Sequence, residues 1–370
     1  YGEAKKSSDD RQMDDFITSL MKKMTLEEKI GQLNLGGVGS PKVVGSAIGL
    51  DEAIRKGLVS SVGGFDAKAA EDAQKFAVEN SRMKIPLITG LDVVHGYYTI
   101  FPIPLASACS WNMPLLEESA RVAADEASAF GINWTFAPMV DICRDPRWGR
   151  IAEGAGEDPC LGSRIGRAMV RGFQGDDLSK PNTLLACVKH FALYGASEAG
   201  RDYNTVSMDP VTMYNYYLPP YKAAFDEGAG SGMTSFNVVN GVPATGNKWL
   251  LTDLLRDQWK FKGFMVSDAN SLAEMSEHGM GGAQRITELA MNAGLDMDMS
   301  SSLYVLCLKK AVEEKRVPLS RIDAACRRVL EAKYKLGLFE DPFRYLKNKQ
   351  RQSQVLSPQN RDVARRLAAE

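Results

Sequence analysis

Apolar residues recur at intervals of three and four positions between Met13 and Met24, and this spacing predicts an amphipathic helix. Thr25 and Glu28 then match a capping box, in which each side chain bonds to the backbone N–H of the other residue. A second helix is therefore expected to begin at this point. The chain is predicted to open with helices rather than with a strand.

After these helices the pattern changes to short apolar and β-branched runs that alternate with amphipathic segments. Such alternation is typical of repeated strand–helix units that build a parallel sheet. The helices have recognisable ends, such as Pro114 near one start and Gly131 after the corresponding end. Eight strands are predicted, over residues 33–36, 60–65, 85–92, 133–141, 184–191, 232–238, 263–268 and 295–300.

Eight units of this kind fit an α/β fold of the (β/α)8 TIM-type barrel, with irregular early strands, and a doubly wound sheet is the alternative. The positions of polar residues favour the barrel, because the carboxyl ends of barrel strands meet at one mouth. Polar residues stand at the carboxyl ends of predicted strands at Asp92, Asp141, His190, Asn237, Asp268 and Asp298.

The length and composition suit one large domain. The 370 residues are 44% hydrophobic, which is enough for a large buried core, and a single domain of this size is most easily a barrel. We expect residues 1–345 to form the barrel with its N-terminal helices. Residues 346–370 are polar and then helical, and we expect them to be a linker towards a second domain.

The net charge and the absence of certain motifs exclude several classes of ligand. With 45 basic and 46 acidic residues, the formal net charge of -1 gives no field that would recruit nucleic acid. No apolar stretch reaches the roughly 20 residues that a membrane span needs. The 6 cysteines lack metal-ligand spacing, the 3 histidines form no HExxH motif, and no glycine-rich nucleotide loop is present. We therefore expect no metal, no other cofactor and a neutral small substrate.

Three polar residues at strand ends are the first candidates for chemistry. Asp268 ends the apolar strand 263–267, where its carboxylate would lie at a pocket floor, although a turn or helix-capping aspartate fits the same pattern. Lys189 and His190 end another apolar strand and supply N–H donors that a polyhydroxylated ligand needs. Because they are adjacent, both can reach one ligand only if the strand is irregular there, through a bulge or a cis peptide.

The segment 143–150 places three arginines, a tryptophan and an Asp-Pro turn within eight residues. One interpretation is an ion-paired surface loop. The other is a rigid arm that is braced by arginine–carboxylate pairs with Glu153, Glu157 or Asp158 and directs one guanidinium at the ligand.

Six ordered motifs resemble glycoside hydrolase family 3, and within it the periplasmic β-glucosidase branch. The resemblance extends over nearly the whole chain, which makes it far more specific than any single motif. The motifs are MTLEEKIGQL, ITGLDVVHGYYTIFPIPLASACSWN, APMVDICRDPRWGRIAEGAGEDP, CVKHFALYGASEAGRDYNTVSM, MTSFNVVNGVPATGNKWLLTDLLRDQWKFKGFMVSD and AACRRVLEAKYKLGLFEDPF.

The resemblance implies a retaining, exo-acting β-glucosidase that is periplasmic or secreted and releases terminal non-reducing β-D-glucosyl residues from oligosaccharides or β-glucosides. Asp268 would attack the anomeric carbon and form a covalent glycosyl intermediate. The same resemblance implies that the hydroxyls of the terminal sugar are bound by Asp92, Arg150, Lys189 and His190, and that Met233 and Phe236 line this subsite.

The sequence departs from the family pattern in three places. An aromatic residue often follows the nucleophile, but Ala269 stands here, and the tyrosine often found near it is replaced by Phe236. In this branch the general acid is a glutamate of a C-terminal α/β sandwich domain, so the acid/base is expected outside this chain. The N-acetylglucosaminidase branch carries a His-Asp dyad in the loop that is residues 195–204 here, and this loop has no histidine.

Two alternatives stay open. The first is a β-N-acetylhexosaminidase or a phosphorylase of the same family, and the second is a non-catalytic sugar-binding barrel. Hydrolysis of aryl glycosides distinguishes them, because a pure sugar-binding protein has affinity for the glycoside without releasing its aglycone.

Overall fold

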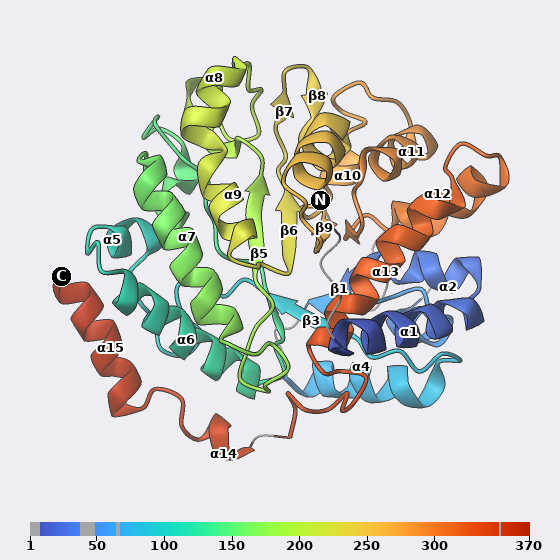
Figure 1. The fold of residues 1–370 in the computed structure, drawn as a ribbon, viewed down its shortest axis with the longest axis horizontal. Coiled ribbons are helices and arrows are strands. Elements are labelled where there is room, and N and C mark those ends of the chain that lie inside the picture. Colours follow the sequence, from blue (N-terminus) through green and yellow to red (C-terminus); the bar gives the residue numbers. More distant parts are fainter. Residues whose placement is uncertain (1–7, 38–48, 64–66, 348) are drawn as a thin grey trace.

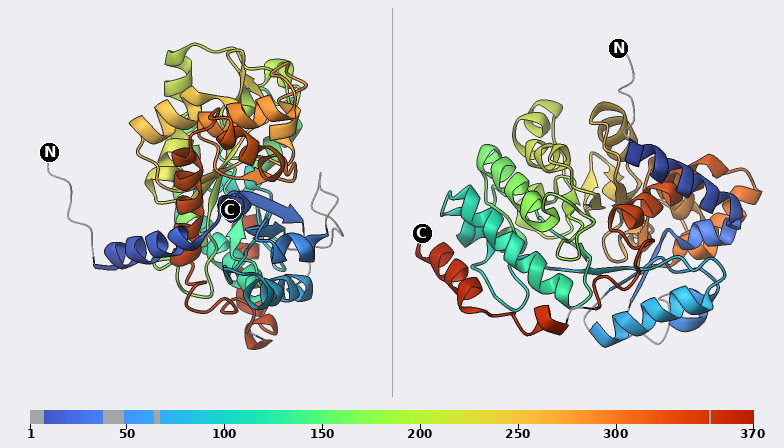
Figure 2. Two further views of the ribbon diagram at one scale, coloured as in Figure 1. Left: turned by 90° about the vertical axis from the view of Figure 1, so that its right-hand side faces the viewer. Right: turned by 60° about the horizontal axis from the view of Figure 1, so that its bottom comes forward.

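The structure, a computed structural model, describes residues 8–37, 49–63, 67–347 and 349–370. It is a mixed α/β fold in which short parallel strands lie inside and helices surround them (Figure 1). Figure 2 shows the same arrangement from two further directions. The two N-terminal helices predicted from the sequence are present. The capping box at the start of the second is formed, because the Thr25 N–H donates to Glu28 Oε2 (2.9 Å) and the Glu28 N–H donates to Thr25 Oγ1 (3.2 Å).

The helices differ in length from single turns to five turns. The α-helices are α1 (Ser8–Lys23), α2 (Leu26–Gly31), α3 (Leu50–Arg55), α4 (Ala67–Asn80), α5 (Pro104–Ala108), α6 (Met113–Ala129), α7 (Pro159–Gln174), α8 (Pro210–Thr212), α9 (Pro219–Asp226), α10 (Ser271–Glu274), α11 (Ala283–Ala293), α12 (Leu303–Glu313), α13 (Leu319–Lys335), α14 (Lys349–Gln352) and α15 (Pro358–Ala369). Helical segments of 3-10 or π type are Gly149–Glu153, Tyr194–Ala196, Glu198–Gly200, Met213–Tyr217, Ala244–Gly246 and Trp249–Gln258.

The parallel strands form two sheets, one in the order β10-β1-β2-β3-β4 and one in the order β5-β6-β9. Single parallel bridges link the sheets on both sides, between Trp134 and Leu185 and between Val266 and Met297. The parallel strands are β1 (Asn34–Gly37), β2 (Ser61–Gly63), β3 (Ile88–Leu91), β4 (Trp134–Thr135), β5 (Cys187–Phe191), β6 (Ser231–Thr234), β9 (Phe264–Val266) and β10 (Asp298–Met299), and a separate antiparallel hairpin is formed by β7 (Val238–Val239) and β8 (Val242–Pro243).

Each of the eight predicted strands overlaps a strand of the structure; β1 has the predicted length but is shifted by one residue, and the other seven are shorter than predicted. The predicted strand 133–141 keeps regular pairing only in β4, because Pro138 has no N–H to donate to a neighbouring strand. Pairing resumes at Met139, which bridges to Lys189. The last two residues of the predicted strand 60–65 lie outside the described residues.

Strand β5 is buried along its whole length, although it contains two basic side chains. Cys187, Val188 and Phe191 are inaccessible to solvent, and Lys189 and His190 are 3% and 1% exposed. A polar group buried in such an interior without a hydrogen bond destabilises the folded state by roughly 2–7 kcal/mol. The end of β5 therefore requires polar partners from neighbouring elements.

The C-terminal segment packs against the body of the protein. In the hydrophobic cluster between α15 and α6, Val363 and Leu367 contact Phe101, Leu115 and Leu116. Figure 1 shows α14 and α15 running along α6. The segment predicted as a linker is thus folded onto α6 where the structure describes it, with residue 348 outside the described part. Its connection to a second domain stays a prediction.

Glu126, on α6, joins this C-terminal segment to the loop after β3. Its buried carboxylate accepts five hydrogen bonds, from Tyr98 N–H (3.0 Å), Thr99 N–H and Oγ1–H (both 2.7 Å), Leu356 N–H (3.0 Å) and Asn360 Nδ2–H (2.9 Å). Burial opposes the charge, but these donors outweigh it and hold the pKa of Glu126 below its ordinary value. The carboxylate therefore fastens two segments that are distant in sequence.

We predict that Glu126→Ala lowers the free energy of unfolding by about 2–3 kcal/mol, because buried donors lose a charged acceptor. Amide hydrogen exchange should accelerate over residues 356–369. The control is Glu118→Ala, which removes an exposed pair with Arg366 on the same two helices and should cost less than about 1 kcal/mol. Equal melting curves and exchange rates for Glu126→Ala and the unmodified protein would contradict the assigned role.

Candidate active site

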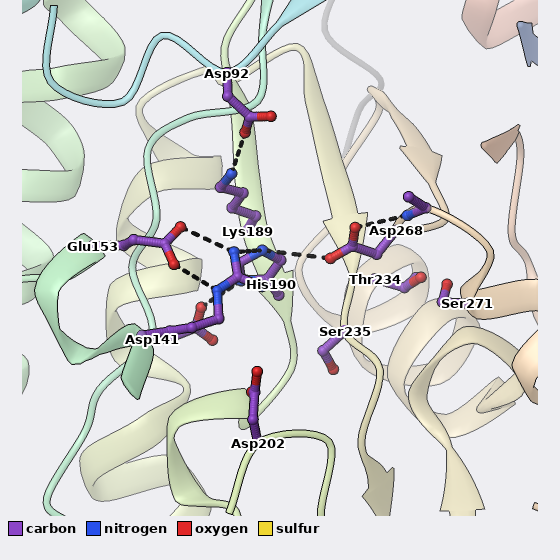
Figure 3. Close-up of polar contacts among 12 residues, drawn as sticks. Asp92, Asp141, Glu153, Lys189, His190, Asp202, Thr234, Ser235, Asp268 and Ser271 are labelled. Carbon is purple, nitrogen blue, oxygen red and sulfur yellow. Dashed lines mark hydrogen bonds and ion pairs between the residues drawn. The ribbon is translucent and has the colours of Figure 1, made fainter. Parts of the chain in front are cut away.

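Polar side chains from several elements meet at the carboxyl ends of the parallel strands (Figure 3). Asp92 directly follows β3, Lys189 and His190 lie at the end of β5, and Asp268 comes two residues after β9. Arg150 belongs to the 3-10 helix Gly149–Glu153. The structure therefore brings together the five polar residues for which the sequence predicted a common site.

Lys189 and His190 both take part in this site although they are adjacent. The peptide between them is cis, and the register of β5 against β6 shifts between Val188 and Phe191. Lys189 Nζ donates to Asp92 Oδ1 over 2.6 Å, and His190 Nδ1 lies 2.8 Å from Asp141 Oδ2. The strand is thus irregular here, as the sequence predicts if both side chains reach one ligand.

Asp141 is the buried partner of His190. Its Oδ2 accepts from the backbone N–H of His190 (2.9 Å), and its Oδ1 accepts from the Tyr221 hydroxyl. Burial raises the pKa of Asp141 to about 6, so the carboxyl is mainly ionised at pH 7. Burial also lowers the pKa of His190 to about 3, so the imidazole is neutral.

These charge states assign the imidazole proton. An ionised carboxylate can only accept, so the neutral His190 ring carries its proton on Nδ1 and donates it to Asp141. Nε2 is then an acceptor, and it lies 3.1 Å from Arg150 Nη2, which donates to it. Asp141 thus fixes both the orientation and the tautomer of His190.

Arg150 is held by a two-point ion pair. Its Nε and Nη2 donate to Glu153 Oε2 (2.6 Å) and Oε1 (2.9 Å), and its guanidinium lies 5.4 Å from the centre of the Tyr194 ring. Burial works against the positive charge, but Glu153 outweighs it and raises the pKa of Arg150. Glu153 is one of the three carboxylates proposed to brace this segment, and Arg147 forms a separate pair with Asp145.

Asp268 presents one free carboxylate oxygen. Oδ1 accepts from the Ala269 N–H over 2.7 Å, whereas Oδ2 has no hydrogen-bond partner among the described residues and lies 3.5 Å from His190 Nε2. The side chain is 14% exposed. Burial raises the pKa of Asp268, and the Lys189 and Arg150 cations act in the opposite direction. A buried, unpaired oxygen is rare in proteins and calls for a functional explanation.

The turn that carries Asp268 is anchored by hydroxyl groups. The Ser271 N–H donates to the Asp268 carbonyl (3.0 Å), and the Asn270 N–H donates to the Met299 carbonyl in β10 (3.1 Å). Thr245 Oγ1 lies 2.9 Å from both Ser271 Oγ and Thr234 Oγ1. This chain of hydroxyls connects the turn to β6 and limits the movement of the carboxylate.

The two apolar residues predicted for the site lie on or after β6. Met233 is buried in β6 and pairs in register with Val266, two residues before Asp268. Phe236 is buried in a cluster with Trp148 and Tyr194, and the Tyr194 ring lies 5.2 Å from His190.

Two residues of this network were not predicted as part of it. Asp141 was noted only as a polar residue at a strand end, and that position was the signal that could have identified it. Tyr221 is the third residue of α9 and carries no local signal, because its partners Asp141 and His190 are distant in sequence.

In the described ranges, no three His, Cys, Asp or Glu side chains are grouped as they would be to hold a metal ion. Among the helices that the structure describes, none combines the length and the apolar character that crossing a membrane requires.

Comparison with known proteins finds relatives that are named as beta-glucosidases and beta-xylosidases. The periplasmic beta-glucosidase of Salmonella typhimurium is 43% identical over 339 residues, which are 90% of this chain and 43% of that protein. A putative beta-xylosidase of Formosa agariphila is 32% identical over 90% of this chain and 47% of its own. The crystal structure of a beta-glucosidase from Listeria innocua in complex with glucose has a TM-score of 0.89 and 40% identity, and covers 95% of this chain and 50% of that one.

The chain thus spans about half the length of the relatives it matches. The family model described as the glycosyl hydrolase family 3 N terminal domain matches residues 25–332, which contain every residue of the network described above. The mixed α/β fold and the strand-end site agree with that match, and the chain belongs to glycosyl hydrolase family 3.

Proposed function

We propose that this chain carries the sugar-binding and nucleophilic part of a retaining, exo-acting β-glucosidase. Asp268 attacks the anomeric carbon of a terminal β-D-glucosyl residue and breaks its bond to the aglycone oxygen, so that the aglycone leaves. Water then hydrolyses the covalent glycosyl intermediate, which releases glucose and restores the Asp268 carboxylate. The observation that carries the proposal is the free Oδ2 of Asp268, which is buried beside His190 and has no other partner among the described residues.

The groups around Asp268 suit a sugar ring. Asp92 has an exposed carboxylate (60%), and Lys189 reaches it with one of its three N–H donors, so both keep capacity for sugar hydroxyls. Arg150 adds a guanidinium from the 3-10 helix Gly149–Glu153, and His190 adds an imidazole from the same strand as Lys189. We assign these four residues to hydroxyl binding and Met233 and Phe236 to the apolar lining of the same subsite.

The substrate assignment rests on the relatives as well. The Listeria innocua protein was crystallised with glucose, and another structure of it contains laminaribiose. The Salmonella relative is named a periplasmic beta-glucosidase, and on that basis we propose that this protein also works outside the cytoplasm. Oligosaccharides and other β-glucosides are the proposed substrates.

We also infer that the two sheets form one closed (β/α)8 barrel. The parallel bridges between Trp134 and Leu185 and between Val266 and Met297 support closure, because they join the free edges of both sheets. Backbone bonds from the Thr135 N–H to the Leu185 carbonyl and from the Ser267 N–H to the Met297 carbonyl, both 2.9 Å, extend these contacts.

We propose that the general acid/base lies outside residues 1–370, in a C-terminal α/β sandwich domain of a longer protein. The relatives support this proposal, because this chain covers only 43% to 50% of their length. The carboxylates of the site support it too, because a carboxylate that is paired with a basic group is poorly suited to donate a proton to the leaving group. Asp92 is bonded to Lys189, Asp141 to His190 and Glu153 to Arg150.

We predict that Asp268→Asn reduces the hydrolysis of 4-nitrophenyl β-D-glucoside by at least about a thousandfold, since an amide cannot act as the nucleophile. The matched control is Asp253→Asn, which changes a surface carboxylate paired with Lys248 and should leave the rate unaltered. Release of nitrophenol by Asp268→Asn within tenfold of the unmodified rate would assign the nucleophile to another residue. Release of nitrophenol from the N-acetylglucosaminide in preference to the glucoside would favour the hexosaminidase alternative.

A second prediction concerns the leaving group. A chain of residues 1–370 should cleave 4-nitrophenyl β-D-glucoside slowly and cellobiose at a vanishing rate, because nitrophenolate departs without protonation and a sugar alkoxide does not. Initial rates of glucose release from both substrates measure the ratio. If cellobiose is cleaved as readily as the aryl glucoside, an acid lies within these residues, and Glu153, Glu157, Glu198 and Glu274 are the first to replace.

A further inference from the structure

Tyr203 is a large aromatic residue that the network described above leaves unused. It lies in the loop 195–204 after β5, and the residue is 48% exposed. Its backbone has φ +65°, in the left-handed region that a bulky residue occupies at a cost of about 1–3 kcal/mol. A strained backbone that presents an exposed aromatic ring suggests that the position of the ring matters.

The ring of Tyr203 is the outermost member of an aromatic cluster that begins at the site. It lies 4.5 Å from the Phe236 ring at an interplanar angle of 54°, and 6.2 Å from the Tyr194 ring at 74°. The Tyr194 ring in turn contacts His190 at 5.2 Å. Phe236 and Tyr194 are both buried, whereas Tyr203, which packs on them, stays about half exposed.

Three carboxylates act electrostatically on the Tyr203 hydroxyl. Burial raises the pKa of Tyr203, and the carboxylates of Asp202, Glu274 and Asp268 raise it further. Asp202 is its neighbour in sequence, but Glu274 and Asp268 belong to the segment after β9. The phenol therefore lies in the electrostatic field of Asp268, and the position of the ring is given by its contacts with Phe236 and Tyr194.

The loop holds this ring in place through contacts on both sides of it. Asp202 Oδ1 accepts from the Trp148 indole N–H over 2.9 Å, and the Glu198 N–H donates to the Thr205 carbonyl over 3.1 Å. Gly200 packs so closely on the backbone of Trp148 that a Cβ atom would lie 2.9 Å from its nitrogen. A ring fixed in advance binds a ligand with less loss of conformational entropy.

We propose that Tyr203 forms the aromatic platform of a leaving-group subsite and that its exposed face stacks on a planar aromatic aglycone of the β-glucoside. The inference rests on the proposed function and specifies the aglycone class. Ala269, next to Asp268, is too small to provide such a surface on the opposite side. Tyr203 therefore contributes to the choice of leaving group and not to recognition of the glucosyl ring.

The test compares two substrates that carry the same sugar. 4-Nitrophenyl β-D-glucoside has an aromatic leaving group, and β-D-glucosyl fluoride has none, while neither requires an acid for departure. We expect Tyr203→Ala and Tyr203→Leu to lower kcat/KM about fivefold to tenfold for the aryl glucoside, which is the effect of one lost aromatic pair. For the fluoride both variants should stay within twofold of the unmodified protein, and Tyr203→Phe should behave as unmodified with both substrates.

The control is Tyr214→Ala, which removes another exposed tyrosine (43%) from the helical segment Met213–Tyr217 and should alter neither substrate. Unchanged activity on the aryl glucoside in Tyr203→Ala, or an equal loss on both substrates, would overturn the proposal that Tyr203 stacks on the aglycone. Failure of the unmodified protein to cleave either substrate would instead overturn the proposed function, and the inference with it. Full activity on the fluoride also shows that the variants are folded.

Discussion

The site depends on one constraint, which is that β5 carries two basic side chains into an apolar interior. Lys189 and His190 can remain there only because each has a polar partner, Asp92 for the lysine and Asp141 for the histidine. Those partners come from segments after β3 and β4, so the burial of two side chains fixes the relative positions of three strand ends. Removal of either carboxylate would leave a buried N–H donor of Lys189 or His190 without its acceptor, which is more costly than losing a surface ion pair.

The same burial sets the charges on which the proposed chemistry relies. His190 stays neutral and presents Nε2 as an acceptor to Arg150, and Arg150 is held in turn by Glu153. Asp268 is left with one oxygen that the described residues do not bond. A sugar that enters the site would therefore meet fixed donors and acceptors on several elements and a carboxylate oxygen held ready by the hydroxyl-anchored turn.

The sequence predicted the strands and the polar strand ends well, because both depend on local patterns: apolar runs mark the eight strands, and Asp268, Lys189 and His190 stand where those runs stop. It did not predict Tyr221 as the partner of Asp141, since that contact joins α9 to the segment after β4 and leaves no mark in either segment. It also missed the docking of residues 349–369 on α6. That docking depends on Glu126, whose carboxylate gathers donors from positions 98 to 360 and looks like an ordinary surface helix residue in the sequence.

The most direct test of the central claim is a crystal structure of the protein with glucose bound. We predict that the anomeric carbon lies about 3–3.5 Å from Asp268 Oδ2, a distance that allows attack. We also predict that the sugar hydroxyls are bonded to Asp92, Arg150, Lys189 and His190. Glucose bound away from these strand ends, or with its anomeric carbon turned from Asp268, would contradict the assignment of Asp268 as the nucleophile.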